Sequence, residues 1–180
     1  MTTVDPIVPD DKDWTWVLQR PCPDCGFDTA TISGAEVAGL LTLNAAAWRE
    51  VLKRSDVHRR PRSDVWSPLE YACHARDVYA LYDVRLHLML DEDGPRFPNW
   101  DQDETARAER YHQQDPVVVA QELTAAQQRL TASFASVVGA QWQRTGTRGD
   151  GVVFTIDGFA RYLIHDPIHH LHDVGHHPAV

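Results

Sequence analysis

The fold follows first from residues 67–90, which read SPLEYACHARDVYALYDVRLHLML. Ser67 and Glu70 have the spacing of a capping box, and Pro68 stands just inside the helix, where its missing N–H is not needed. The apolar residues that follow recur at helical intervals until a Gly-Pro pair interrupts the pattern. We therefore predict a long helix over residues 68–90.

Three further segments have the same helical periodicity, and we predict helices over residues 33–54, 115–139 and 157–174. Each begins with a residue that caps helices well, namely Ser33, Asp115 or Asp157. Gly139 and Gly175 end the last two helices. Four long amphipathic helices in 180 residues predict an all-α domain with the fold of a four-helix bundle.

The segments outside these helices complete the predicted organisation. Residues 1–32 are rich in Asp, Pro and Thr, and they read as an extended arm that lies over the body of the domain. We expect the bundle to span residues 33–175 and a short tail to span residues 176–180. Residues 91–114 form a long acidic connection, and a run of apolar residues at 152–156 indicates a short strand or extended segment.

The charge and composition exclude several classes of function. The chain carries 26 acidic and 17 basic residues, a formal net charge of −9 that repels phosphate backbones, so we expect no nucleic acid partner. No apolar run is long enough to cross a membrane, and the N-terminus has neither the basic start nor the apolar run of a secretion signal. We therefore expect a cytoplasmic protein whose three cysteines are reduced.

Ten histidines are many for this length, and they concentrate near the C-terminus. His165 and His169 are four residues apart, a spacing that brings two imidazoles close enough to share a metal ion. His74 lies among apolar positions of the helix predicted over 68–90. A lone inward histidine is more often a core residue, but three buried imidazoles without an ion would each need other partners. We predict one divalent ion at His74, His165 and His169, with open positions for water or substrate.

Other residues near these histidines have plainer interpretations. We expect a polar helix face and a tail from His170, His172, His176 and His177. Asp173, four residues after His169, either orients a ligand ring or is an exposed carboxylate at the helix end. Asp77 has the same two interpretations relative to His74. Pro167 is an objection to the predicted site, because an interior proline bends a helix and shifts the side chains on either side.

The arm contains a CxxC motif, Cys22-Pro23-Asp24-Cys25-Gly26, which has the spacing of half a zinc knuckle. No second CxxC is present to complete four ligands. Three interpretations stay open: half a site that histidines complete, a redox-active pair, or a turn with two incidental thiols. The surrounding pattern is not thioredoxin-like, which counts against redox chemistry. In each case the arm can fold across the metal end and help to shape a pocket.

Three stretches together resemble the DinB-like superfamily of four-helix bundle proteins, which includes mycothiol- and bacillithiol-dependent enzymes. They are residues 66–74 (WSPLEYACH), residues 100–103 (WDQD) with Tyr111, and residues 165–173 (HDPIHHLHD). The resemblance covers roughly residues 33–175. It implies a divalent metal ion, often zinc or nickel, at one end of the bundle. The ligands come from the second and last helices, and His74, His165 and His169 stand at those positions.

The resemblance also implies a range of activities. Relatives use the metal to activate a low-molecular-weight thiol or water for transfer, isomerisation or hydrolysis, and they include many homodimers. We therefore expect a thiol-dependent transferase or isomerase, or a hydrolase-like enzyme, with a small-molecule substrate. Some relatives have Glu where His165 stands, and an extra nitrogen donor favours zinc or nickel. The alternative is a non-catalytic, stress-related or dimeric interaction protein that binds metal.

Overall fold

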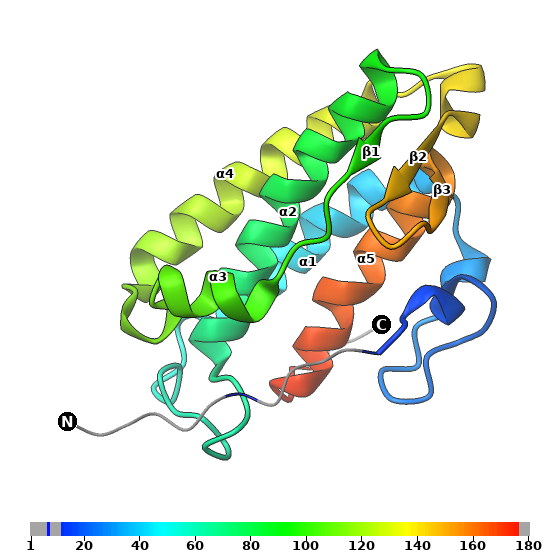
Figure 1. The fold of residues 1–180 in the computed structure, drawn as a ribbon. Coiled ribbons are helices and arrows are strands. Elements are labelled where there is room, and N and C mark those ends of the chain that lie inside the picture. The colour runs from blue at the N-terminus through cyan, green and yellow to red at the C-terminus, as the bar shows by residue number, and fades with distance from the viewer. Residues whose placement is uncertain (1–6, 8–11, 177–180) are drawn as a thin grey trace.

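Four long helices pack side by side, with a small sheet at one end and the N-terminal arm along one side (Figure 1). The structure is a computed structural model that describes residue 7 and residues 12–176. The long helices are α1 (Val37–Val51), α2 (Pro68–Asp91), α4 (Pro116–Ala135) and α5 (Ile156–Asp173), and a short α3 spans Gln102–Ala108. The predicted helical bundle is therefore confirmed. Among the described helices, none combines the length and the apolar character that crossing a membrane requires.

Short 3-10 helices join these elements: η1 (Thr15–Leu18), η2 (Thr29–Thr31), η3 (Gly34–Glu36), η4 (Tyr111–Gln113) and η5 (Gly139–Gln143). At the start of α2 the Ser67 N–H donates to Glu70 Oε2 at 2.8 Å, and the Glu70 N–H donates to Ser67 Oγ at 3.3 Å. The predicted capping box is therefore confirmed. The Ser33 N–H likewise donates to Glu36 Oε2 at 2.9 Å, although a 3-10 turn precedes α1 there.

The last helix begins at a different cap from the predicted one. The hydroxyl of Thr155, not the carboxylate of Asp157, accepts a hydrogen bond from the Gly158 N–H, at 3.0 Å. Asp157 Oδ1 instead accepts from the Gly34 N–H at 2.7 Å, a contact between residues 123 apart in the sequence. The prediction was wrong because this carboxylate joins α5 to the start of the bundle, a partner that local sequence does not reveal.

The connections hold a three-stranded sheet that the sequence predicted only in part. The expected strand is present as β3 (Val153–Thr155), which pairs antiparallel with β2 (Thr145–Arg148) across a turn where Gly151 has φ +94°. β1 (Arg96–Phe97) lies in the acidic connection and pairs parallel with β2. Strands this short carry no alternating pattern of apolar residues, so β1 and β2 were not predicted.

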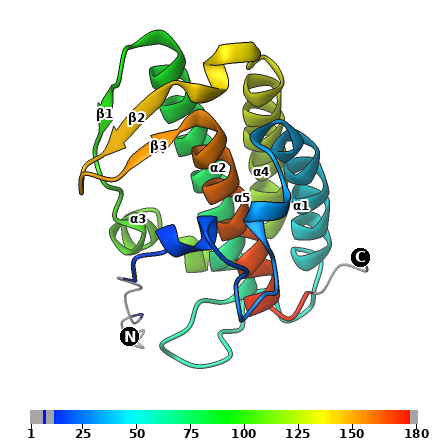
Figure 2. The same cartoon turned by 90° about the vertical axis from the view of Figure 1, so that its right-hand side faces the viewer.

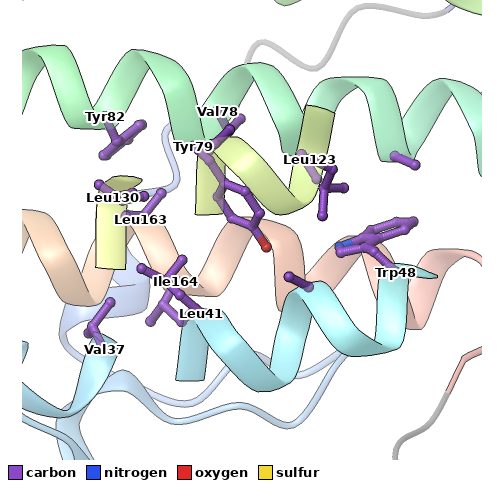
Figure 3. Packing of buried hydrophobic residues seen from close by; sticks show 14 of the residues in the cluster. Val37, Leu41, Trp48, Val78, Tyr79, Tyr82, Leu123, Leu130, Leu163 and Ile164 are labelled. Carbon is purple, nitrogen blue, oxygen red and sulfur yellow. The ribbon is translucent and has the colours of Figure 1, made fainter. Parts of the chain in front are cut away.

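The core lies between the four long helices. Figure 3 shows Leu41 and Trp48 of α1, Tyr79 of α2 and Ile164 of α5 directed into one interior, where all four are fully buried. The Tyr79 hydroxyl donates to Asn44 Oδ1 at 2.5 Å, so the one polar atom of this ring is satisfied. Burial of each such side chain contributes about 1.5–3 kcal/mol to the free energy of folding. This packing fixes the rotation of α2 and α5, and with it the direction in which their histidines point.

The arm lies beside α5 (Figure 2). Val17, Cys22 and Thr29 are buried, and Thr29 Oγ1 donates to the Val17 carbonyl at 2.5 Å. The arm is thus packed against the bundle from η1 onward. Parts of the predicted arm and tail lie outside the described residues: 1–6, 8–11 and 177–180, including His177.

Candidate metal centre

α2 begins and α5 ends at the same end of the bundle (Figure 1), and the predicted ligands belong to these parts of the two helices. His74 stands two turns into α2, and His165 and His169 stand in the last turns of α5. All three are buried, with exposed fractions of 0% for His74, 3% for His165 and 9% for His169. The inward direction predicted for His74 is therefore confirmed.

The structure divides these three histidines between two groups of metal-binding side chains. His74, Asp166 and His170 form the first donor group, in which each offers a ligand atom and these atoms all lie within 4.8 Å of one another. His165 and His169 belong to a second group. Within residues 12–176, the structure therefore does not unite the three histidines in one group. A single ion shared by them stays a prediction, and the geometry favours a different ligand set.

One residue of offset along α5 explains this division. Successive residues of an α-helix are rotated by about 100°, so neighbours in sequence face different partners. His165 and His169 face the arm, whereas Asp166 and His170 face α2. The i, i+4 spacing that indicated the first pair holds equally for the second. The spacing of Asp166 and His170 was therefore visible in the sequence. Choosing between the two pairs requires knowing how α5 is rotated in the bundle, which the sequence alone does not show.

The separations in the first donor group match those of ligands around one cation. His74 Nε2 lies 3.3 Å from Oδ1 and 3.4 Å from Oδ2 of Asp166, and His170 Nε2 lies 3.7 Å from Oδ2. Two ligand atoms about 2.1 Å from a tetrahedral ion are about 3.4 Å apart. Asp166 Oδ1 is buried without a hydrogen-bond partner, a state that a bound cation would relieve. His74 Nδ1 is also buried without one.

Asp166 in the first group and His165 in the second have shifted pKa values. Burial raises the pKa of the Asp166 carboxyl, but the charges of His74 and His170 and the hydrogen bond from His74 lower it more, so the net pKa lies below its ordinary value. Burial, reinforced by the charge of His169, lowers the pKa of His165 to about 4. At neutral pH the carboxylate is therefore ionised and the His165 imidazole is neutral.

Neighbouring side chains hold the first donor group in place. The His170 Nδ1–H donates to Asp173 Oδ2 at 2.8 Å, which leaves Nε2 directed toward Asp166. Trp100 stacks on His74 with ring centroids 5.4 Å apart and 9° between the planes. The Tyr71 ring lies against His170 with centroids 4.8 Å apart. The two imidazoles are thus fixed in orientation before any ion binds.

Three secondary expectations need correction. His170 does not lie on a polar face, because its side chain is only 16% exposed and belongs to the first donor group. Asp173 hydrogen-bonds His170 and only approaches His169, with 3.7 Å between Oδ1 and Nε2. Asp77 accepts a hydrogen bond from the Tyr111 hydroxyl and none from the histidine of its own helix.

A cavity of about 570 Å³ adjoins the first donor group and is lined by arm, α2, α5 and the connections. Two arginines place positive charge in its wall. Arg148 is paired with Asp150 at 2.8 Å and donates to the Tyr162 hydroxyl at 3.1 Å. Arg85 is 6% exposed and donates to the Pro98 carbonyl at 2.7 Å, and no carboxylate of the described residues pairs with it. Desolvation of this guanidinium lowers its pKa.

A family model described as the DinB superfamily matches residues 43–174. This match covers most of the chain, including all of α2 and all of α5. The chain belongs to the DinB superfamily. The predicted membership is confirmed, and the first donor group of this DinB protein lies entirely within the matched residues. Cys22 and Cys25 lie outside them.

A solved structure with the same fold is YfiT from Bacillus subtilis, described as "a probable metal-dependent hydrolase with an unusual four-helix bundle topology". The TM-score is 0.69, the identity is 19%, and the alignment covers 77% of this DinB protein and 82% of YfiT. At this identity the likeness establishes the fold alone. No curated protein matches the chain.

Proposed function

We propose that this DinB protein is a metal-dependent enzyme whose divalent ion is held by His74, Asp166 and His170 beside the cavity. The observation that carries the proposal is the convergence of these three donor atoms within 4.8 Å, with the His170 ring already oriented by Asp173. Three protein ligands leave coordination positions open, as in catalytic rather than structural metal sites. Two imidazoles and a carboxylate suit a divalent first-row metal such as zinc or nickel.

The side chains around the site would prepare it for chemistry. A divalent ion bound there would act as a Lewis acid and lower the pKa of a water molecule or thiol to near neutral. Trp66 and Trp100 flank the His74 ring with centroids 5.3 and 5.4 Å away, which limits the access of bulk water. Asp166 supplies the negative charge that anchors the ion, and Asp173 prevents the His170 ring from turning away.

The arginines of the cavity favour a small substrate that carries a carboxylate or phosphate. Arg85 is the stronger indication, because a desolvated guanidinium without a carboxylate partner gains most from an anionic ligand. Transfer to a low-molecular-weight thiol, isomerisation and hydrolysis are all compatible with such a substrate. The expected homodimer stays a prediction.

Metal content tests the ligand assignment directly. Asp166→Ala should bind one metal equivalent fewer than the wild type in elemental analysis, because it removes the charged ligand. His87→Gln is the matched control, since His87 lies on α2 with its ring 55% exposed and should leave the metal content unchanged. An unchanged content in Asp166→Ala would refute this ligand set.

Activity tests the enzymatic part of the proposal. The zinc- or nickel-loaded protein is assayed on a p-nitrophenyl ester for hydrolysis, and on an electrophilic aryl halide with a low-molecular-weight thiol for transfer. Asp166→Ala should lower the active reaction by more than about 100-fold, since loss of an outer-shell partner alone costs about 10–100-fold. A loaded protein that turns over neither probe, or an Asp166→Ala variant as active as the wild type, would favour the non-catalytic alternative.

A further inference from the structure

We propose a second metal site: a four-coordinate zinc ion held by Cys22, Cys25, His165 and His169, which fastens the N-terminal arm to α5. It shares no ligand with the first donor group. Its two cysteines lie outside the residues that the family model matches. The site therefore adds to the proposed enzymatic one and does not depend on it.

The arm presents both cysteines from a tight turn. The Cys22 N–H donates to the Phe27 carbonyl at 2.9 Å, and the Gly26 N–H donates to the Cys22 carbonyl at 2.9 Å. Gly26 has φ +74°, a conformation that favours glycine. These bonds close a loop that directs both thiols toward α5, which is how half of a zinc knuckle presents its ligands.

The last helix presents the matching pair of imidazoles. His169 Nδ1 lies 3.5 Å from Cys22 Sγ, and His165 Nε2 lies 3.7 Å from Cys25 Sγ. Around a tetrahedral zinc ion, with Zn–S of about 2.3 Å and Zn–N of about 2.0–2.1 Å, sulfur and nitrogen are about 3.6 Å apart. The four donor atoms all lie within 4.8 Å of one another. The observed spacings are therefore those of two edges of one coordination tetrahedron.

The environment of the group also fits a zinc ion. Cys22 is 1% exposed, and His165 and His169 are buried as well. Two thiolates balance the charge of Zn²⁺, so the loaded site would be neutral, which suits burial. On the far side of His169, Nε2 lies 3.7 Å from a carboxylate oxygen of Asp173, where the ring of a metal ligand commonly faces an acceptor.

Two separate thiol–imidazole hydrogen bonds are the rival explanation. They would account for each distance taken singly, but they do not require both pairs to converge on one centre. A redox pair is the other alternative, and both cysteines are free in the structure. Four protein ligands leave no open position, so the convergence points to a structural zinc ion.

This zinc ion would also shape the cavity of the first site. Trp14 packs against both histidines, with ring centroids 5.6 Å from His165 and 5.1 Å from His169. Trp14 and Lys12 line the cavity. The arm is therefore a wall of the proposed active site, and the zinc ion would hold that wall against α5.

The decisive experiment uses the full chain, purified reduced, with zinc or cobalt as the added metal. The double variant Cys22→Ser/Cys25→Ser should bind one zinc equivalent fewer than the wild type and should lose the thiolate-to-cobalt charge-transfer absorption. Cys73→Ala is the matched control, because Cys73 is buried between α2 and η4 and belongs to neither group. It should keep both the zinc content and the absorption.

A conservative variant separates loss of a ligand from loss of folding. Cys25→His preserves four ligands, so it should keep the zinc and retain about half of the charge-transfer intensity, since one thiolate remains. The proposal would be overturned if the double substitution left the zinc content unchanged. It would also be overturned if the reduced, cobalt-loaded wild type showed no thiolate-to-cobalt absorption. Failure of the first site has a different signature: the wild type would then hold one zinc ion and the double cysteine variant none.

Discussion

At the scale of single residues, Glu70 shows how one buried carboxylate can serve two structural purposes. Oε2 accepts the Ser67 N–H of the capping box, and Oε1 lies 2.5 Å from the guanidinium of Arg60. The Glu70 side chain is 3% exposed. Burial raises its pKa, but the hydrogen bonds and charge from Arg60 and the bonds from Ser67 lower it more, so the net pKa lies below the ordinary 4.5.

Glu70→Gln should lower the free energy of unfolding by about 3 kcal/mol at neutral pH, because it leaves Arg60 without its carboxylate partner. The lowered folded-state pKa means that this stability is present above pH 4.5 and is lost as the pH falls toward the folded-state value. Urea unfolding should therefore show a difference between wild type and variant that shrinks as the pH falls below 4.5. A difference that stays constant over this range would contradict the ion pair.

The candidate metal ligands show, at the same scale, what residue types alone can and cannot indicate. The imidazole pair in HxxxH was a visible signal for metal binding, and both histidines do lie in a donor group. Asp166 was not among the predicted ligands, and a lone carboxylate on a helix is usually solvated. Its importance comes from His74, which is 92 residues away in the sequence and 3.4 Å away in space.

At the scale of elements, α5 carries two ligand pairs on adjacent faces. Pro167 lies inside this helix, yet α5 is continuous from Ile156 to Asp173. The objection that proline would disturb the i, i+4 spacing therefore does not apply here. The same helix joins the first donor group to α2 and the second to the arm, so its rotation in the core sets both sites at once.

The start of the bundle offers a matched pair of glycine substitutions. Gly34→Ala should destabilise the protein by about 1–3 kcal/mol. Its new Cβ would lie 2.6 Å from the Trp142 ring and 3.0 Å from the Asp157 backbone. Gly39→Ala, in α1 with open space around it, should stabilise the protein by up to about 1 kcal/mol. Thermal and urea unfolding of both variants measure the contrast. If both substitutions changed the free energy of unfolding in the same direction, the close approach of Gly34 to Trp142 would not constrain η3.

At the scale of the whole molecule, the cavity lies between the helical bundle and segments outside it. Its wall includes His74 and Arg85 from α2, Trp100 from the acidic connection and Trp14 from the arm. The arm, which lies beside α5 (Figure 2), therefore closes part of this wall. In the proposed function, the arm would therefore form part of the active-site wall.

Removal of metal by a strong chelator should loosen the arm selectively. Amide hydrogen exchange over residues 14–29 should speed up by at least about 10-fold, because the arm loses its cross-link to α5, while α4 keeps its protection. Cys73→Ala should behave like the wild type, and Cys22→Ser/Cys25→Ser should exchange fast even with zinc present. Slow exchange in the arm after complete removal of metal would show that packing alone holds it.

Much of this architecture could be predicted because its causes are local. The capping boxes at Ser33 and Ser67 involve residues three apart, and Gly175 ends α5 with φ +68°. The short strands β1 and β2 and the cap at Thr155 were missed. The strands depend on hydrogen bonds between segments that are separated in the sequence. Asp157 does not cap α5 because its carboxylate accepts a hydrogen bond from the Gly34 N–H instead.

The sequence by itself determined the four long helices, since caps and helical spacing act over a few residues. It also determined which side chains are available to bind a metal ion. It left open how the CxxC motif would be used. Only the tertiary structure decided which side chains meet. Cys22 approaches His169 across 147 residues, and His74 approaches Asp166 across 92. These pairings follow from the rotation of α5 in a close-packed core and from the path of the arm, which no local pattern encodes.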